Sequence, residues 1–423
     1  MASYQMLLSL SNKNNAMPVD LRNMPGVRVR PNPPKIARWV SVLVILIGAG
    51  VVISRLMTGN NNLWIAAGLP IAVISALLFI FFMIYAVQLI VANSHDKERE
   101  RTIIREVQRG RRALQILAAE CCTAHSPINT PFAMASSNLL ENKDVFFPQS
   151  SWRGEENTRL SQIARPDGLN EEQHLGTLFT ALLNKLALPL QQLPADTPVM
   201  VLLEHSSSLP EEKTRAFFWD AWNQAGIRQT GADLAGGGAR MIDFWLDNNI
   251  KSEALLLVVS WQYAPVDTAM SAETVNALLF GNRLTQEILP PLAFLHRPEA
   301  SQGTSDELEY AIQQALDWVP VEADIPEHLW LSGVVADNEE HSSLMKAISH
   351  TALKNVNQIT GTHNFNDFLG DPGNAAIWLS MVAATQSIQQ QPAYHLLICR
   401  EQRNGKVWNM VVSPAVRAKE SKA

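Results

Sequence analysis

The first candidates for chemistry are two adjacent cysteines, Cys121 and Cys122, which lie shortly before His125. A thiolate beside an imidazole can act as a nucleophile. The preceding run, Ala113–Ala119, has the pattern of a strand, and neighbouring residues of a strand point to opposite faces of a sheet. The two thiols cannot serve one site, so we interpret them as buried hydrophobic residues. Cys399 is the third and last cysteine, and so few cysteines fit a reducing compartment without a disulfide framework.

A second candidate is the run His205–Ser208, where serines follow a predicted strand and a histidine could activate one of them. No Gly-x-Ser-x-Gly sequence surrounds these serines, so a polar turn is the simpler interpretation. The glycines Gly236–Gly238 do not form a phosphate loop, because no Lys-Ser or Lys-Thr pair follows them. The ten histidines show no spacing typical of metal ligands. We therefore expect no cofactor and no bound metal.

Two uncharged segments near the N-terminus predict a pair of transmembrane helices. Leu63–Val91 contains 29 residues without a charge, whereas about 20 apolar residues suffice to cross a bilayer. Trp39–Ser54 is uncharged over 16 residues, and the arginines that bracket it can reach the interface, which extends the span to residues 36–57. A signal peptide would lie closer to Met1. A buried hairpin of a soluble protein is the other alternative, but the second segment is apolar on every face.

The flanking charges predict how this hairpin is oriented. The loop at residues 58–62 is short and polar, so the two spans must be antiparallel neighbours. The basic residues outside the spans are Arg22, Arg28, Arg30, Lys35 and Arg38 before them, and Lys97, Arg99, Arg101, Arg105, Arg109, Arg111 and Arg112 after them. The positive-inside rule then places both termini in the cytoplasm. Our hypothesis for the membrane is a bacterial inner membrane. Residues 1–35 would form a flexible basic arm, residues 36–93 the hairpin, and residues 94–112 a charged helical stalk that ends near Gly110.

Residues 113–418 predict a cytoplasmic α/β domain. The predicted strands are Ala113–Ala119, Pro198–Leu203, Ala254–Ser260, Val275–Phe280, Leu329–Val335, Tyr394–Cys399 and Lys406–Val412. The predicted helices are Gln173–Leu188, Glu211–Gly226, Gly238–Asn249, Ser305–Trp318, His341–Lys354 and Asn374–Gln390. This alternation indicates a layered domain with a largely parallel sheet. Residues 126–172 show little periodicity and predict an irregular excursion.

Two blocks of this domain share one pattern. In the first block, Gly236–Gly238 opens a helix, and strands at Ala254–Ser260 and Val275–Phe280 follow. In the second block, Gly370–Ala376 opens a helix, and two strands joined by a glycine turn end the domain. The blocks resemble the two halves of thiolases and β-ketoacyl synthases. The resemblance implies a thiolase-like, layered α/β/α/β/α domain with similar halves, about 113–300 and 301–418; another α/β fold is the alternative.

The resemblance also implies where a catalytic site would lie. Enzymes of this group have a cysteine nucleophile at the start of the buried helix in the first half. The matching stretch, Thr230–Gly238, contains neither Cys nor Ser, and Ala232 falls near the nucleophile position. His363 and Asn374 occupy places where the second half of such enzymes supplies His and Asn. Without a nucleophile we interpret these two as loop polar groups and expect no catalytic residue. The two family helices meet at the pseudo-dyad, so we expect the helices after Gly236–Gly238 and near Asn374 to be buried and in contact.

The leading hypothesis is a non-catalytic domain tethered to the bilayer, which serves protein–protein contact in a membrane assembly. The net charge of −6 and the pI near 6.0 argue against a general nucleic-acid binder. A hairpin followed by a cytoplasmic domain is similar to accessory membrane proteins of bacterial secretion systems, type VI among them. The thiolase-like resemblance also implies a homodimer. The alternatives are a membrane-tethered acyltransferase or hydrolase and a sensor of an acyl ligand.

Overall fold

The computed structural model describes residues 19, 21, 24–58, 67–133, 136–145, 160–285, 288–319, 326–333 and 339–415 of the chain. The start of the second predicted span at Leu63 and most of the basic arm lie outside these residues. The described residues fall into two compact units, divided between Gln108 and Arg109. Each unit is considered by itself.

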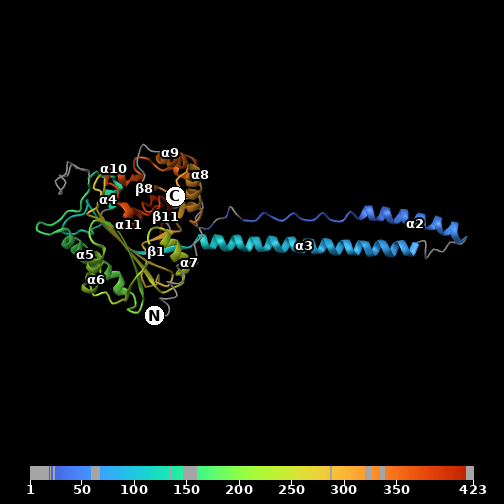
Figure 1. The fold of residues 1–423 in the computed structure, drawn as a ribbon, viewed down its shortest axis with the longest axis horizontal. Helices are drawn as coiled ribbons and strands as arrows, with labels where there is room; N and C mark the ends of the chain where they lie inside the picture. The colour runs from blue at the N-terminus through green and yellow to red at the C-terminus, as the bar shows by residue number, and fades with distance from the viewer. Residues whose placement is uncertain are drawn as a thin grey trace, which may run out of the picture. The chain divides into compact units, whose positions relative to one another are not determined.

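The unit before Arg109 is built on two long helices, α2 (Ile36–Thr58) and α3 (Leu69–Gly110) (Figure 1). Both helices are long and apolar enough to cross a membrane, judged by length and composition. Trp39 of α2 lies near Phe81 of α3, with 6.0 Å between the ring centroids. The helix α3 continues without a break through the charged residues that follow its apolar part and ends at Gly110.

The extended residues before α2 run beside the charged part of α3. The backbone N–H of Arg28 donates to Oδ1 of Asp96 over 3.0 Å, and Nε of Arg99 donates to the carbonyl oxygen of Pro25 over 2.6 Å. The first bond has its donor in the extended segment, and the second has its donor in α3. They hold the approach to α2 against the charged end of α3.

The other unit is an α/β domain of two similar halves. The first half contains strands β1 (Ala113–Thr123), β2 (Val199–Ser207), β3 (Gly231–Asp233), β4 (Leu255–Tyr263) and β5 (Thr274–Gly281), with helices α4 (Ser136–Leu140), α5 (Glu171–Gln192), α6 (Glu211–Gln224) and α7 (Arg240–Asn248). The second half contains strands β6 (Ala293–His296), β7 (Glu299–Ser301), β8 (His328–Ser332), β9 (Thr362–Asn364), β10 (His395–Arg400) and β11 (Val407–Pro414). Its helices are α8 (Ser305–Asp317), α9 (Glu339–His350), η2 (Ala352–Asn355), α10 (Phe365–Phe368), η3 (Gly373–Ala375) and α11 (Ala376–Gln390).

The strand order shows that the halves are equivalent. The order is β3-β2-β4-β5-β1 in the first half and continues β6-β11-β10-β8-β9 in the second. Counted inward from the two edges of the sheet, the strands correspond in position as follows: β3 to β9, β2 to β8, β4 to β10, β5 to β11 and β1 to β6. The halves join where β1 and β6 run antiparallel. By the same correspondence, α7 of the first half is the counterpart of α11 of the second, since each precedes the matching pair of strands.

The prediction of a largely parallel sheet is wrong, because the sheet is mixed. β5 is antiparallel to β4 and β1, and β11 is antiparallel to β10 and β6. The reason lies in the connections: β4 ends at Tyr263 and β5 begins at Thr274, while β10 ends at Arg400 and β11 begins at Val407. A parallel crossover needs a dozen or more residues, so these short connections can only reverse the chain.

Three apolar clusters show the layers of the domain. The central cluster combines residues of α7 and α11 with strand residues from both halves, including Leu256, Phe280, Leu397 and Met410. A second cluster lies under α5 and α6, and a third lies under α8 and α9. Figure 1 shows α5 and α6 on one side of the domain, α8 and α9 on the other, and α11 between them. The predicted layered α/β domain is therefore confirmed, and each of the seven predicted strands corresponds to a strand of the structure, although the end of the one predicted at Leu329–Val335 lies outside the described residues.

Candidate functional site

A buried carboxylate lies where the central helices begin. Glu204 stands in the last part of β2, after an apolar run that fixes the strand, and its side chain is 2% exposed. Its Oε2 accepts hydrogen bonds from the backbone N–H of Gly238 (2.9 Å) and from Nε1 of Trp378 (2.8 Å). Burial raises the pKa of Glu204, and the bond from Gly238 opposes this rise. One carboxylate thus ties the turn before α7 to the first residues of α11.

The glycine turns before α7 and α11 are each contacted by a side chain from the other half of the domain. Gly238 and Gly373 both have left-handed backbones, with φ of +66° and +58°. A Cβ on Gly238 would overlap Oε1 of Glu401, which directly follows β10, and a Cβ on Gly373 would overlap Oε1 of Gln262 in β4. Because β4 and β10 are counterparts, each turn is closed by a side chain from the end of the equivalent strand in the other half. A left-handed backbone with a side-chain oxygen at the place of a Cβ strongly favours glycine at both positions.

The side chains that contact the two glycine turns differ in charge. Glu401 accepts from Nε1 of Trp408 (2.8 Å) and from Nδ2 of Asn404 (2.9 Å), so its carboxylate stays beside Gly238. Nη1 of Arg403 lies 3.7 Å from Oε1 of Glu204 and balances part of the negative charge. The turn before α7 therefore faces two carboxylates.

The turn before α11 faces an amide instead. Nε2 of Gln262 donates to the carbonyl oxygens of Asp371 (2.6 Å) and Ala272 (3.1 Å), which leaves its Oε1 turned toward Gly373. The side chain of Asp371 accepts from the N–H of Gly373 over 2.9 Å. Oδ1 of Asn374 is buried here without a hydrogen-bond partner among the described residues.

The structure separates the three residues that the resemblance singled out. Ala232 lies on β3, paired with Met200, well before α7 begins at Arg240. His363 lies on β9, at the opposite end of the strand order. Asn374 alone stands at the start of α11.

His363 belongs to a buried aromatic stack. Its ring lies 4.3 Å from that of Trp330, its Nε2 is 3.1 Å from Nδ1 of His328, and its Nδ1 is 2.7 Å from Oδ1 of Asn142. Since Oδ1 can only accept, His363 carries its proton on Nδ1, and Nε2 accepts from His328. Burial lowers the pKa of His363 to about 3, so the ring is neutral at physiological pH.

The three cysteines are fully buried, and the histidine of the His205–Ser208 run is stacked on a tryptophan. Cys121 belongs to the central apolar cluster and Cys122 to the cluster under α5 and α6, as expected for adjacent strand residues on opposite faces. Burial raises the pKa of Cys122 and of Cys399 to about 12, and it raises that of Cys121 as well. His205 stacks on Trp261 with ring centroids 5.0 Å apart. All three thiols are therefore protonated at neutral pH.

The expected direct packing of α7 on α11 needs correction. Gly236 is exposed and Gly237 is partly exposed, whereas Gly238 and Ala239 are buried, so only the end of the glycine turn reaches the core. The first turns of the helices meet through Glu204, and their apolar faces share one cluster. Gly237 and Gly238 lie directly against the carboxylates of Glu204 and Glu401. A charged residue at the end of an apolar strand, as at Glu204, was the available sequence signal.

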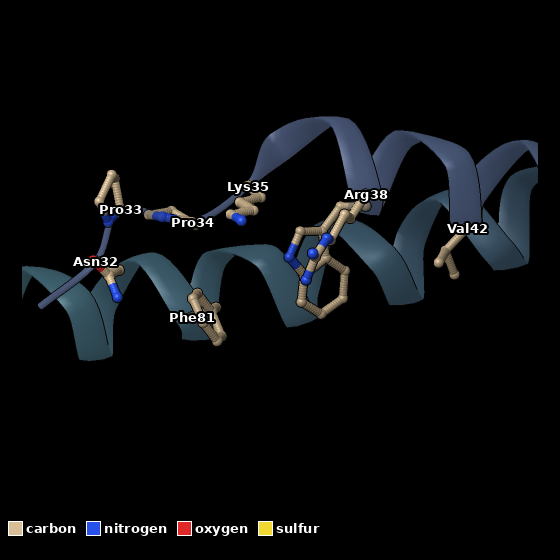
Figure 2. A pocket seen from close by; sticks show the side chains of 8 residues that line it. Asn32, Pro33, Pro34, Lys35, Arg38, Val42 and Phe81 are labelled. Atoms are coloured by element: carbon tan, nitrogen blue, oxygen red, sulfur yellow. The ribbon is translucent and has the colours of Figure 1, made fainter.

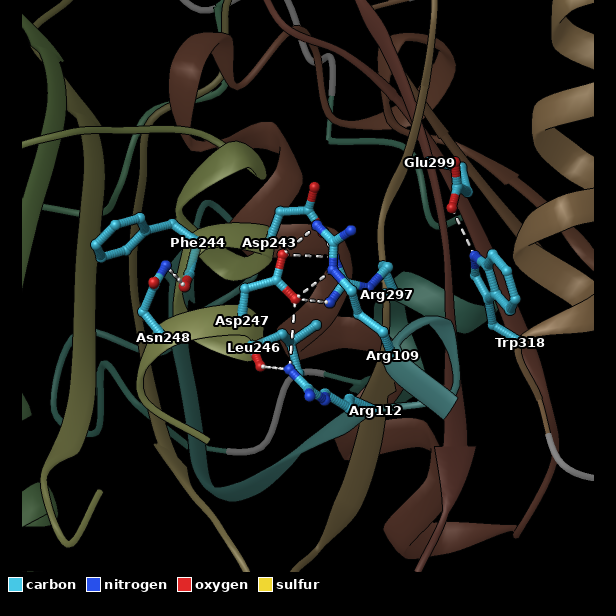
Figure 3. A network of polar contacts seen from close by, with 10 residues as sticks. All are labelled: Arg109, Arg112, Asp243, Phe244, Leu246, Asp247, Asn248, Arg297, Glu299 and Trp318. Atoms are coloured by element: carbon cyan, nitrogen blue, oxygen red, sulfur yellow. Dashed lines mark hydrogen bonds and ion pairs between the residues drawn. The ribbon is translucent and has the colours of Figure 1, made fainter. Parts of the chain in front are cut away.

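The far end of α7 is held by a network of charged residues (Figure 3). Arg297 is fully buried, and it pairs with Asp243 through Nη1 and with Asp247 through Nη2, the latter over 2.6 Å. Arg109 donates two hydrogen bonds to the same Asp247, from Nε to Oδ1 over 3.0 Å and from Nη2 to Oδ2 over 2.6 Å. Nη1 of Arg112 donates to the carbonyl oxygen of Leu246 over 3.1 Å.

An aromatic contact lies beside this network. A Cβ on Gly110 would overlap the ring of Trp318, and Nε1 of Trp318 donates to Oε1 of Glu299 over 2.5 Å. Gly110, three residues before β1, is therefore packed as closely as a core residue. Among the described residues, no three His, Cys, Asp or Glu side chains are grouped as metal ligands would be.

Comparison with known proteins gives a fold and no closer relative. No protein-family model and no curated protein matches the chain. A chain from the complex of a type II polyketide synthase acyl-carrier protein with its ketosynthase is similar at a TM-score of 0.50 and 11% identity, over 72% of this chain and 99% of that one. The ishigamide ketosynthase/chain length factor gives 0.49 and 15%, over 72% and 99%. Human mitochondrial 3-ketoacyl-CoA thiolase with CoA gives 0.45 and 9%, over 72% and 98%. The match to the ketosynthase complex, at a TM-score of 0.50 and 11% identity, shows the thiolase-like fold alone.

Proposed function

We propose that this chain is a membrane-anchored protein with a thiolase-like domain that performs no catalysis, and that it serves as an interaction component of an assembly at a bacterial inner membrane. The observation that carries the proposal is the state of the Gly238 amide, which donates to the carboxylate of Glu204. At the start of a central helix, such an amide could stabilise an oxyanion. Here the protein's own carboxylate takes that donor.

The chemistry around Gly238 supports the same conclusion. An acyl-enzyme needs a nucleophile, and the stretch Thr230–Gly238 supplies neither a cysteine nor a serine. Glu401 lies on the other side of Gly238, so a developing oxyanion would meet two carboxylates. Like charges in a buried site raise the energy of an anionic transition state. The site is therefore suited to holding the two halves together.

The membrane part of the proposal rests on α2 and α3. We propose that they cross the bilayer as an antiparallel hairpin, with both termini in the cytoplasm, because basic residues flank both outer ends. Tethered copies would gain in effective concentration from a shared membrane, which favours a homodimer and contacts with other membrane proteins. A place in a secretion assembly, of type VI or another kind, is supported only by the order of hairpin and domain.

The test is a search for covalent chemistry by the full chain purified in detergent. The protein is incubated with a series of acyl-CoA substrates, and its intact mass and the released CoA are measured. We expect no adduct and no CoA release above the protein-free control. An acyl adduct on one residue, abolished by replacing that residue, would establish an enzyme instead. A reversibly bound acyl species in native mass spectrometry would favour the ligand-sensor alternative.

A second arm tests the anchor. Membranes that contain the full chain are washed with alkaline carbonate. We expect the protein to remain in the membrane fraction. Its release would contradict the transmembrane hairpin, whatever the result with acyl-CoA.

A further inference from the structure

An open cavity of about 450 Å³ lies where α2 begins, within the unit before Arg109. Residues of the approach to α2 and of its first turns form most of its wall, and α3 closes the other side (Figure 2). The residues that line this hairpin cavity are Asn32, Pro33, Pro34, Lys35, Arg38, Trp39, Val42 and Phe81. The two prolines stiffen the chain on one side, since their φ angles are fixed.

Two cationic side chains stand together at the hairpin cavity. Lys35 and Arg38 are three residues apart, and the N–H of Arg38 donates to the carbonyl oxygen of Lys35 over 3.0 Å, so they share one turn. Both are exposed, and in the part of the chain that the structure describes neither forms an ion pair with an acidic side chain. An anion at this place would meet two positive charges that no acidic side chain of the described residues occupies.

The wall below these cations is apolar. Trp39 and Phe81 lie 6.0 Å apart between ring centroids with their planes tilted by 58°, and Val42 continues the surface one turn further along α2. The ring of Phe81 is still 44% exposed despite this neighbour. A ligand that fits both parts has an anionic head and a hydrocarbon tail.

We propose that the hairpin cavity binds one anionic phospholipid, with its phosphodiester between Lys35 and Arg38 and the start of an acyl chain along Trp39, Val42 and Phe81. This inference rests on the proposed transmembrane hairpin, since only an inserted α2 meets lipid at that level. Basic sites between helices at the cytoplasmic face are suited to anionic headgroups. A zwitterionic lipid offers the same phosphate but adds a cation, which Lys35 and Arg38 would repel.

The experiment uses the full chain in detergent and native mass spectrometry with an equimolar mixture of phosphatidylglycerol and phosphatidylcholine. The wild-type protein should retain one phosphatidylglycerol in preference to phosphatidylcholine. Lys35→Gln with Arg38→Gln should lower the affinity for phosphatidylglycerol about tenfold to thirtyfold, since each cation near an anionic surface contributes about fivefold. The affinity for phosphatidylcholine should stay the same.

The matched control removes two cations from the same unit outside the hairpin cavity, by Lys97→Gln with Arg101→Gln. It should keep the preference for phosphatidylglycerol; an equal loss in both double variants would show general attraction to basic residues and overturn the site. Val42→Trp fills the cavity while it keeps both charges, and it should weaken binding as well. Unchanged binding in that variant would contradict the proposed acyl contact.

Two further outcomes separate this inference from its premise. Excess inorganic phosphate should not displace the lipid; displacement would identify a plain anion site. If carbonate releases the wild-type protein from membranes, the proposed anchor fails. If the protein stays in the membrane but shows no preference for phosphatidylglycerol, only the lipid site fails.

Discussion

The helices α7 and α11 occupy equivalent places in the two halves but have different surroundings. α11 has 15 residues, of which 13 are buried, whereas α7 has nine, of which four are buried. α11 contains no charged residue, while α7 carries Asp243 and Asp247 into the network around Arg297. A shared topology therefore fixes where a helix lies in the chain order without fixing what it contacts. In this structure α11 lies almost wholly in the apolar core, whereas α7 also carries the acidic residues that bind Arg297.

The largest effect should come from the buried helix. Trp378→Ala removes a large side chain that is fully buried and takes away a donor to Glu204. We expect a loss of about 3–5 kcal/mol from the cavity and about 1–3 kcal/mol from the hydrogen bond that the buried carboxylate loses. Thermal unfolding of the full chain in detergent would measure it. Trp378→Phe also loses the donor to Glu204 but keeps most of the volume, so it separates the two parts; a loss equal to that of Trp378→Ala would show that the cavity contributes little.

The charged helix should respond strongly to the loss of its buried partner. Arg297→Met leaves Asp243 without its arginine in a buried place, for an expected cost of about 3–5 kcal/mol. Arg109→Gln should cost less, because Asp247 keeps Arg297 and Arg109 is partly exposed. Chemical denaturation would rank the two variants. If Arg109→Gln proves the more damaging, the buried pair is not the centre of the network.

The glycine turns should tolerate a methyl group poorly. Gly238→Ala and Gly373→Ala each place a Cβ on a left-handed backbone, where it overlaps Glu401 or Gln262. We expect a cost of about 1–3 kcal/mol in unfolding free energy. Gly226→Ala has a similar positive φ but open space around it, so it isolates the backbone part. Unfolding free energies of the three variants would test this. Equal costs at all three would mean that the exchanged side chains simply move aside.

Acid should weaken the stack of histidines in the second half. β8 and β10 begin with His328 and His395, and β9 holds His363, whereas the equivalent β2, β3 and β4 contain no stacked imidazoles at their starts. The pKa of His363 falls from 6.5 to about 3 on folding, so the unfolded chain binds the extra proton. Stability is then full above pH 6.5 and declines as the pH falls toward 3, by up to about 1.4 kcal/mol per pH unit.

His363→Phe keeps a ring in the stack and removes one titrating group. The slope of unfolding free energy against pH should become smaller between pH 6.5 and 4. Circular dichroism of thermal unfolding at several pH values would measure it. A variant with the wild-type slope would show that His363 is not neutral in the folded protein.

The smallest effect is expected at the candidate nucleophiles. Replacing Cys121, Cys122 and Cys399 together by alanine should leave cellular function intact at normal abundance, although a few kcal/mol of stability are lost from the core. His363→Ala should likewise keep function. Complementation with abundance measured by immunoblot would check both. Loss of function in a folded, abundant protein would revive the enzyme hypothesis.

Much of the fold followed from patterns along the chain, and the site followed only in part. Apolar runs located the seven longer strands, but β3 and β9 have three residues each and leave no pattern. The glycine turns were recognised, whereas their neighbours were not, because Glu401 and Gln262 reach them from the other half. A linear pattern carries no information on which side chains cross a pseudo-dyad. The direction of β5 and β11 was missed although the short connections before them were visible.

The packing around Gly110 sets where a shorter recombinant fragment could begin. The compact α/β unit includes Arg109, and Gly110 presses on Trp318 before the first strand starts. A fragment begun at Ala113 would lose both arginines that bind α7 from outside the domain core, Arg109 and Arg112, and would uncover a tryptophan ring. Such a fragment would carry two acidic residues on α7 with Arg297 as their remaining partner. Retaining the last turn of α3 is therefore part of obtaining the domain in its native form.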